Sequence, residues 1–332
     1  MSSLAHSKLA YEVVEGWEHL PDGMAFTEVA GVAVDSKDRV YLFCRGRHPV
    51  LVFDKDGHFL STWGEGTFAN PHGITITRDD RVFLVDNFDH TVREYTVDGT
   101  LLNTIGEPSK PSDTGFRVDH CPVCRSAGPF NMVTNVALGP EGDLFVADGY
   151  ANARVHKFSA KGELTCSWGE PGNGEGEFNL PHGIAIDSAG TVYVADRENS
   201  RVQLFRPDGT FVKSWDWTNR PSDIFIDDQD RIYIAEMGFR PAELPVHYSN
   251  WMVEPPAGHD PITRVSICEP DGTIIEQIGG ADPFPPGNFI APHGLCVDSR
   301  GDIYVGEVTK AARKIWAPLA PRCFQKFRRG PR

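Results

Sequence analysis

One pattern of sequence recurs six times along this chain and constrains its fold more than any other feature. Each copy starts with a small residue or a His-Gly pair, continues as an alternating apolar run, turns at an Asp or Gly, and ends in a second apolar run. The copies are GVAVDSKDRVYLFCRG from Gly31, HGITITRDDRVFLVDNF from His72, TNVALGPEGDLFVADGY from Thr134, HGIAIDSAGTVYVADRE from His182, SDIFIDDQDRIYIAEMG from Ser222 and HGLCVDSRGDIYVGEVT from His293. The apolar residues alternate with a period of two, so each run is predicted to be a β-strand with one inward face.

The spacing of the copies predicts a β-propeller. Five copies continue into a further strand and a turn that contains glycine, as in VREYTVDGTLLNTIG, and Asp-Gly between alternating runs indicates a hairpin. Counted from Ala30, which precedes Gly31 and matches His72, successive copies start 42, 62, 48, 40 and 71 residues apart. Four short strands in about 40–50 residues are typical of one propeller blade. We therefore predict an all-β fold, a six-bladed propeller with four-stranded antiparallel blades around a central channel, in which residues 107–130 and 238–262 are loop insertions.

A propeller must close its ring, and the chain offers a segment for this purpose. The N-terminal stretch 9–17, LAYEVVEGW, is predicted to supply the outer strand of the last blade. The sequence of that blade is expected to end at Arg313–Trp316. On this interpretation residues 1–332 form a single domain.

Charge and hydropathy exclude several classes of partner. The chain has 332 residues and a formal net charge of −14, whereas binding to nucleic acid needs a basic surface. No apolar run approaches the roughly 20 residues of a membrane span. The N-terminus lacks the apolar stretch of a secretory signal, and the seven cysteines are scattered, so we expect a reduced cytoplasmic protein. A small-molecule substrate is the expected partner, and the oligomeric state is left open.

Three histidines occupy matched positions in the second, fourth and sixth copies. His72, His182 and His293 lie in the contexts NPHGI, LPHGI and APHGL. Alternate blades of a six-bladed ring stand about 120° apart, so side chains at this position would converge on the axis if they face the channel. Three imidazoles with an open fourth position are typical of a catalytic zinc site. Imidazole also suits iron, nickel and copper, so zinc is the first expectation and another divalent transition metal remains possible.

An acid follows each of these histidines by 14 residues. Asp86, Asp196 and Glu307 could orient the imidazole rings from behind. Asp148 and Glu236 hold the same place in copies that lack the histidine. We therefore expect these acids to cap turns in the fold.

The copies resemble NHL repeats over nearly the whole chain, and the Gly-His and Trp-Asp signature of WD40 repeats is absent. Four segments are in addition similar to peptidyl-α-hydroxyglycine α-amidating lyase, the lyase domain of peptidylglycine amidating enzymes. They are FCRGRH at 43–48, ADGYANAR at 147–154, LPHGIAI with the downstream VADRENSRVQLF at 194–205, and APHGL at 291–295. The resemblance implies that the three histidines bind zinc.

The same resemblance implies which residues act on the substrate. The family's catalytic tyrosine matches Tyr150, and its active-site arginines match Arg45 and Arg197. The family reaction is the collapse of a carbinolamide to a carbonyl compound and an amide. In that reaction the metal would act as a Lewis acid on the substrate hydroxyl, Tyr150 as the base, and the arginines would stabilise negative charge or hold a substrate carboxylate.

The chain departs from the family pattern at three places. The family carries Asp directly after the third histidine, where it serves a structural calcium; Gly294 stands here, so structural Ca²⁺ is not expected. Secreted members carry disulfides near the DGY and ADREN segments, where this chain has Ala151 and Leu204. The segment Arg117–Phe130 of the first insertion has no obvious family counterpart. Its C-x-x-C pair, Cys121 and Cys124, could bind zinc or form a redox pair, but one such pair is only half of a usual zinc site, so we expect the insertion to be a loop over the channel mouth.

Long loops on a rigid scaffold commonly shape a pocket. The insertion at 238–262 is rich in proline and aromatic residues, so His247, Tyr248, Trp251 and Met252 are candidate substrate contacts.

These features predict a metal-dependent lyase that cleaves a C–N or C–O bond at a hydroxyl-bearing carbon of a small molecule. A metal-dependent hydrolase of an ester, lactone or amide is an alternative on the same propeller. A non-catalytic NHL binding module is a second alternative, although such a module has no need of imidazoles on alternate blades.

Overall fold

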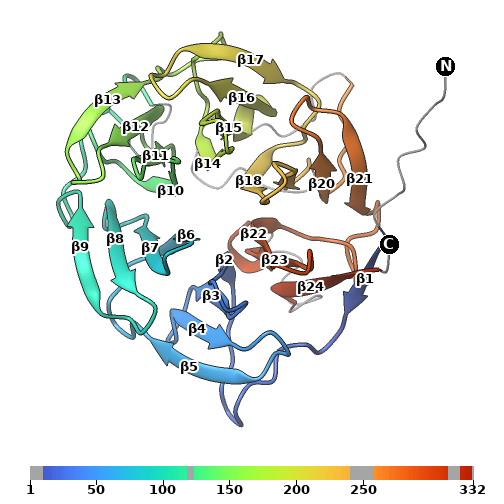
Figure 1. Cartoon of the computed structure of the whole chain (residues 1–332). Helices are drawn as coiled ribbons and strands as arrows, with labels where there is room; N and C mark the ends of the chain where they lie inside the picture. Colours follow the sequence, from blue (N-terminus) through green and yellow to red (C-terminus); the bar gives the residue numbers. More distant parts are fainter. Residues whose placement is uncertain (1–9, 118–122, 240–257, 313–321, 331–332) are drawn as a thin grey trace.

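In the computed structural model of the chain, six four-stranded antiparallel sheets stand around a central axis, as Figure 1 shows. The structure describes residues 10–117, 123–239, 258–312 and 322–330. Within the described residues the regular secondary structure is almost entirely β-strand, as the repeat predicts. The six-bladed propeller expected from the sequence is therefore confirmed.

Each blade builds outward from the axis. Blades 1, 2 and 3 contain β2 (Val29–Val34), β3 (Val40–Cys44), β4 (Val50–Phe53) and β5 (Phe59–Trp63); β6 (Pro71–Ile76), β7 (Arg81–Asp86), β8 (Thr91–Thr96) and β9 (Leu101–Ile105); and β10 (Val133–Leu138), β11 (Leu144–Asp148), β12 (Arg154–Phe158) and β13 (Leu164–Trp168). Blades 4, 5 and 6 contain β14 (Pro181–Ile186), β15 (Val192–Asp196), β16 (Arg201–Phe205) and β17 (Phe211–Trp215); β18 (Pro221–Ile226), β19 (Ile232–Glu236), β20 (Arg264–Cys268) and β21 (Ile274–Gly279); and β22 (Pro292–Val297), β23 (Ile303–Glu307), β24 (Phe324–Arg329) and β1 (Tyr11–Val14). Two short helices, η1 (Arg197–Asn199) and α1 (Thr309–Ala312), follow β15 and β23.

The last blade combines both ends of the chain. β1 pairs antiparallel with β24, so that Tyr11 lies opposite Arg329 and Val14 opposite Lys326. The third strand of this blade is β24, whereas the sequence pattern placed it at Arg313–Trp316. That prediction was wrong about which residues form the strand: β24 pairs with β23, and residues 313–321 lie outside the described part.

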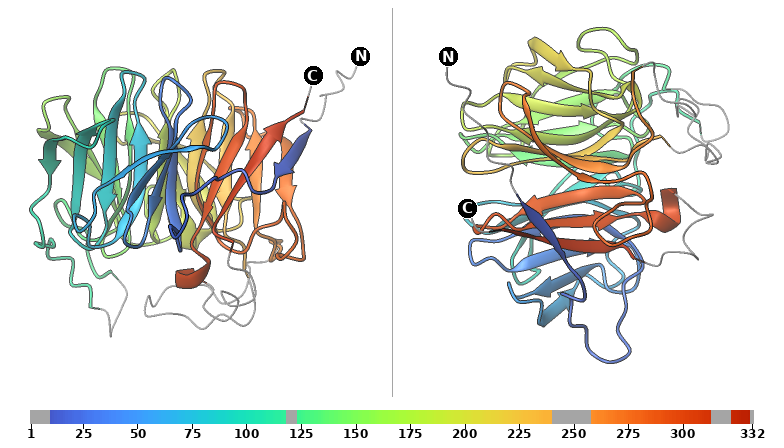
Figure 2. Two further views of the ribbon diagram at one scale, coloured as in Figure 1. Left: turned by 90° about the horizontal axis from the view of Figure 1, so that it is seen from below. Right: turned by 90° about the vertical axis from the view of Figure 1, so that its right-hand side faces the viewer.

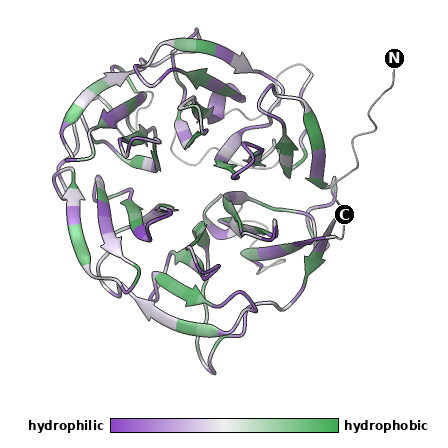
Figure 3. Ribbon diagram, in the orientation of Figure 1, coloured by the Kyte–Doolittle hydropathy of each residue, from purple (hydrophilic) through white to green (hydrophobic). Residues whose placement is uncertain are grey.

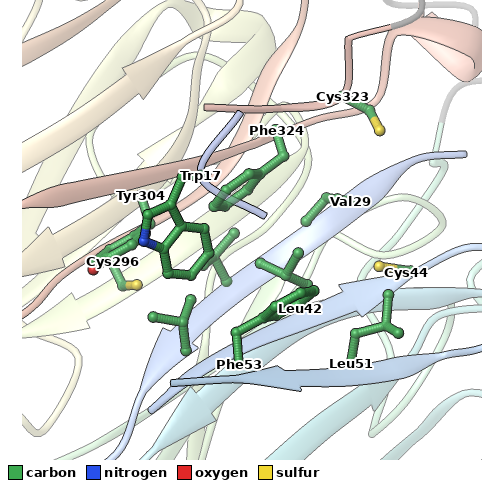
Figure 4. Packing of buried hydrophobic residues seen from close by; sticks show 12 residues of the cluster. Trp17, Val29, Leu42, Cys44, Leu51, Phe53, Cys296, Tyr304, Cys323 and Phe324 are labelled. Carbon is green, nitrogen blue, oxygen red and sulfur yellow. The ribbon is translucent and has the colours of Figure 1, made fainter. Parts of the chain in front are cut away.

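The described part of the hydrophobic core contains six clusters that each lie between two neighbouring blades, and a small seventh cluster of Ala30, Met237, Ala291 and Val308. The second strand of every blade is buried on both faces, and each of the six larger clusters takes residues from two successive sheets. Figure 4 shows the cluster between blades 6 and 1, where Trp17 packs beside Phe53, Tyr304 and Phe324. Figure 3 shows that every blade contains both apolar stretches, in green, and polar stretches, in purple.

In each blade the strand register places the first residues of the innermost strand opposite the last residues of the second strand. Pro71 lies opposite Asp86, Pro181 opposite Asp196, and Pro292 opposite Glu307. The start of each innermost strand and the loop after each second strand therefore share one face of the ring. The described parts of the first insertion and helix α1 extend from a common face as well, as Figure 2 shows. Among the residues that the structure describes, no helix is long and apolar enough to cross a membrane.

Candidate metal centre and active site

Each of the three histidines lies in an irregular segment at the start of an innermost strand. The pairing of β14 with β15 shifts register between Pro181 and Ile184, and that of β6 with β7 shifts between Pro71 and Ile74. The remaining four blades show a register shift at the matching place. A β-bulge interrupts pairing and re-aims a side chain, which is how a residue of a continuous strand comes to point at the channel axis.

The three imidazoles converge, as the sequence predicts. One ring nitrogen of each of His72, His182 and His293 lies within 4.8 Å of the corresponding nitrogen of the other two. The three pairs of ring centroids are all 4.7 Å apart. Within the described ranges this is the one group of three or more His, Cys, Asp or Glu side chains with such a geometry.

Backbone carbonyls of the following blades fix the orientation of all three rings. The Nδ1 atoms of His72, His182 and His293 lie 2.6, 2.5 and 2.7 Å from the carbonyl oxygens of Thr134, Ser222 and Ala30. A carbonyl can only accept, so each Nδ1 carries the proton and each Nε2 presents its lone pair to the centre. The three acceptors hold the position in their own repeats that histidine holds in the alternate ones.

Burial keeps these rings neutral. Their exposed fractions are 2% for His72, 2% for His182 and 4% for His293. Burial, with Arg45 as the next cause, lowers the pKa of His293 to about 3. Burial followed by the charges of neighbouring rings and arginines holds the pKa of His72 and of His182 well below the ordinary value.

The donor set fits a divalent transition metal. Neutral imidazoles with Nε2 lone pairs are the form that coordinates zinc, and Nδ1–H donation to a carbonyl is the usual support behind such a ligand. His293 Nε2 is buried and has no hydrogen-bond partner among the described residues. A buried acceptor without a partner is costly, and an ion between the three rings would satisfy it. The three histidines would hold such an ion.

Tyr150 lies directly beside this group. Its Oη is 3.1 Å from His182 Nε2 and 3.4 Å from His72 Nε2. Arg197 Nη1 donates to the same oxygen at 3.2 Å, and the guanidinium carbon stands 5.3 Å from the centre of the phenol ring. The structure thus brings together two of the three residues that the sequence predicts for catalysis.

Arg45 approaches the histidines from the opposite side of the ring. It follows β3 in blade 1, and Arg197 follows β15 in blade 4, so the two arginines occupy equivalent places in opposite blades. Arg45 Nε donates to the carbonyl of Pro71 at 3.1 Å, directly before His72. The hydroxyls of Thr134 and Ser222 lie 3.0 and 2.8 Å from the carbonyls of Pro181 and Pro292, which are the equivalents of Pro71.

Ala30, which matches Thr134 and Ser222 in its repeat, has no hydroxyl, so Arg45 makes the contact that a side chain at position 30 would make. Arg45 is therefore tied to the strand of His72 and contributes positive charge near two of the rings.

The acids that follow each histidine by 14 residues cap the backbone that leads into the histidine strand. Asp86 accepts from Ala69 N and Asn70 N, and Glu307 accepts from Ile290 N and Ala291 N. Asp196 accepts from Asn179 N. They support the site through the backbone, in agreement with the capping role expected from the sequence.

Sequence reasoning missed two buried residues next to the predicted ones. Glu198 accepts from Arg197 Nε at 2.8 Å, and Arg220 donates to both carboxylate oxygens of Glu198. Glu198 stands beside Arg197 in the ADREN segment, which could have drawn attention to it. Arg220 lies 22 residues further along in another blade, and no local pattern indicates it.

A second polar pair crosses the channel one residue beyond the histidine position. Asn135 Nδ2 donates to Asp223 Oδ1 at 2.8 Å, and Leu295 N donates to Asp223 Oδ2 at 3.0 Å. These contacts connect blades 3, 5 and 6. The other four copies carry glycine here, and at Gly294 an added Cβ would stand 2.7 Å from Gly31 Cα. The structure thus gives position 294 no room for the aspartate that the family uses for calcium.

The channel carboxylate makes folding stability depend on pH. Burial raises the pKa of Asp223 to about 7, so between about pH 4 and 7 the folded chain holds a proton that the unfolded chain releases. Its contribution to stability is complete at low pH and is lost as pH rises through 7. When the pH is raised from 5 to 8, the free energy of unfolding of the parent should fall by about 2 kcal/mol more than that of the Asp223→Asn variant, which lacks the titrating carboxyl.

Urea unfolding of both proteins at the two pH values measures this difference, with the exposed Asp228→Asn as the control. Equal pH dependence of the parent and Asp223→Asn would show that the carboxyl titrates alike in the folded and unfolded chains.

Several predicted residues lie outside the described part. They are His247, Tyr248, Trp251 and Met252 of the second insertion and Cys121 of the first. Cys124 is exposed, and its Sγ lies 3.8 Å from the Gly115 carbonyl. The role of the four residues of the second insertion as substrate contacts stays a prediction, and the role of the cysteine pair stays open.

Comparison with known proteins places the repeat in a family. The family model described as NHL repeat matches residues 178–205. NHL repeat-containing protein 3 of Homo sapiens is 31% identical over 331 residues, which cover 94% of this chain and 85% of that protein. A probable peptidyl-alpha-hydroxyglycine alpha-amidating lyase, pgal-1 of Caenorhabditis elegans, is 46% identical over 79 residues, or 23% of each chain.

Among solved structures, streptogramin B lyase superimposes with a TM-score of 0.60 at 12% identity and covers 99% of this chain and 100% of its own, a likeness of fold alone. The related propellers thus include enzymes. The long match to the human protein and the repeat model together show the family: the chain belongs with NHL repeat-containing protein 3 among the NHL-repeat propellers.

Proposed function

We propose that this protein is a metal-dependent lyase that cleaves a C–N or C–O bond at a hydroxyl-bearing carbon of a small-molecule substrate. The observation that supports this most is the meeting of three neutral imidazoles with a phenol oxygen 3.1 Å from one Nε2 and a guanidinium 3.2 Å behind it. The local identity to an amidating lyase supports the same reaction type.

The reaction requires movement of one proton and no water. In an N-acyl carbinolamine the hydroxyl O–H bond breaks, the C=O bond forms, the C–N bond breaks, and the nitrogen leaves with a proton as an amide. The base that takes the hydroxyl proton can return it to nitrogen, so the atoms balance without a further reactant. A divalent ion held by the three histidines would act as a Lewis acid toward the substrate hydroxyl.

The protein's own side chains divide the remaining tasks. The Tyr150 oxygen is the group beside the histidines that can take the hydroxyl proton and pass it to the leaving nitrogen. Arg197 stabilises negative charge on that oxygen, because its guanidinium already donates to it. Arg45 stands across the channel and places a second positive charge where a substrate oxyanion or carboxylate would lie between the two arginines.

A substrate with two distinguishable bonds tests this assignment. N-Benzoyl-α-hydroxyglycine offers the carbinolamine C–N bond and, next to it, an ordinary amide bond. With zinc-loaded protein in ¹⁸O-water we expect benzamide and glyoxylate, with no ¹⁸O in the benzamide. Benzoate that carries ¹⁸O would instead identify an amide hydrolase, the alternative enzymatic function.

Turnover of neither bond by protein with full zinc content, on this probe and on an ester and a lactone, would contradict both enzymatic assignments. The non-catalytic binding module would then be the interpretation that fits. Loss of turnover in the His182→Ala variant, described below, is the control that ties any activity to the site.

A further inference from the structure

Behind Tyr150 lies a buried row of three charged side chains from blades 4 and 5. Arg197, Glu198 and Arg220 are 1%, 0% and 3% exposed. Glu198 Oε1 accepts hydrogen bonds from Arg197 Nε at 2.8 Å and from Arg220 Nη2 at 2.9 Å. Glu198 Oε2 accepts a hydrogen bond from Arg220 Nε at 3.2 Å. The carboxylate is therefore held side-on by Arg220 and through a single donor by Arg197.

Stability alone is a weak reason for such a row. Taking three charges out of water costs several kcal/mol per ion, and well-packed apolar side chains of similar volume often serve stability equally well or better. The row is therefore better explained by what it does for the group at its end, which is the Tyr150 oxygen.

The geometry fixes the direction of the Arg197 guanidinium. Because Glu198 engages Nε, the planar group is held along one edge, and its Nη1 is directed to Tyr150 Oη at 3.2 Å. Glu198 comes from the same short helix, η1, as Arg197, so this contact is local and short-ranged.

Arg220 leaves the row with a net charge of +1. If Glu198 had Arg197 as its single cationic neighbour, the two charges would cancel at the phenol. Burial alone would raise the pKa of Glu198, but Arg220 first and Arg197 second outweigh it and hold that pKa below its ordinary value. The carboxylate thus stays ionised, and one positive charge in excess faces Tyr150.

Arg220 is itself anchored on its far side. Its Nη1 donates to the Gly238 carbonyl at 3.2 Å, and its guanidinium carbon lies 5.8 Å from the centre of the buried Phe239 ring. The row is therefore fixed at both ends, by the phenol in the channel and by the backbone after β19.

We propose that Glu198 and Arg220 are positioning residues for the reaction: they orient Arg197 and preserve its positive charge toward the Tyr150 oxygen. This inference rests on the proposed function, in which that oxygen moves the substrate proton. It assigns to these two residues a role that is exerted through Arg197.

The Arg220→Gln variant tests the role of the charge, since Glu198 keeps Arg197 as its partner and no unbalanced buried charge is created. With N-benzoyl-α-hydroxyglycine as the probe we expect kcat to fall about 10-fold or more, KM to change less than about 2-fold, and zinc content to stay at that of the parent. Arg220→Lys should recover most of kcat. Arg231→Gln, which breaks the 3.3 Å pair with Asp227 at the other end of blade 5, is the matched control and should leave kcat unchanged.

A double-mutant cycle separates positioning from mere support of the fold. If Arg220 acts through Arg197 on Tyr150, the Arg220→Gln effect on kcat should shrink to less than about 2-fold in the Tyr150→Phe background. An effect of equal size in both backgrounds, or a loss of kcat in step with thermal stability across the variants, would overturn the proposal.

A crystal structure of Arg220→Gln provides a readout that needs no substrate. We expect the Arg197 Nη1 to Tyr150 Oη contact to lengthen beyond hydrogen-bond distance or the guanidinium to rotate. An unchanged contact would count against the orienting role. Absence of turnover in the parent protein would contradict the proposed function, whereas this structural comparison would still decide the positioning role.

Discussion

The His182→Ala variant is expected to lose metal and activity together. The substitution removes one of the three Nε2 lone pairs, and the two remaining imidazoles bind a metal ion much more weakly. We expect zinc to fall from about one ion per chain to less than about 0.1 after dialysis against a chelator, and turnover to fall about 1,000-fold or more. Plasma emission spectrometry and the benzamide assay on the same preparation measure the two quantities.

His58→Ala is the matched control, because that imidazole is 66% exposed and lies outside the channel. It should keep both zinc and turnover. Full zinc occupancy in His182→Ala would show that the ion binds elsewhere, and full turnover without zinc would remove the metal from the chemistry.

The Tyr150→Phe variant is expected to keep its metal and lose most of its turnover. The phenol oxygen is not required to hold the rings, whose Nδ1 atoms are fixed by backbone carbonyls. Loss of the group that transfers the proton should lower kcat about 100-fold or more, since positioned acid–base groups contribute factors of 10²–10⁴. Zinc analysis and steady-state kinetics check both parts.

Tyr193→Phe serves as the comparison for Tyr150→Phe. Tyr193 donates its hydroxyl to Asp187 at 3.1 Å, a contact buried within blade 4. We expect its loss to lower thermal stability and to leave kcat unchanged. Near-normal turnover of Tyr150→Phe would mean that another group moves the proton.

Much of the fold could be predicted because the repeat states it six times. Alternation of apolar residues fixes the strands, the period fixes the blades, and the matched histidines of copies two, four and six fix the convergence on the axis. The last blade could not be completed in this way. Its third strand, β24, lies beyond a segment with no matching phrase, so the pattern pointed to Arg313–Trp316 instead.

The site residues that lie in a recognisable motif could be predicted from the sequence, whereas contacts between residues of different blades could not. His72, His182 and His293 share a motif, and Tyr150 lies in a segment similar to the lyase family. The row of Arg197, Glu198 and Arg220 depends on a contact between residues that lie 22 positions apart in two different sheets, and no local sequence pattern indicates that contact. The hydrogen bond between Asn135 and Asp223, which are 88 residues apart, likewise has no local sequence pattern that predicts it.

Zinc K-edge X-ray absorption of the zinc-loaded protein tests most directly whether the three histidines share one ion. We expect a first shell of nitrogen and oxygen at about 2.0–2.1 Å, outer-shell scattering from three imidazoles, and loss of one imidazole in His182→Ala. A sulfur shell near 2.3 Å, or a spectrum without imidazole scattering, would place the zinc at other ligands and contradict the account.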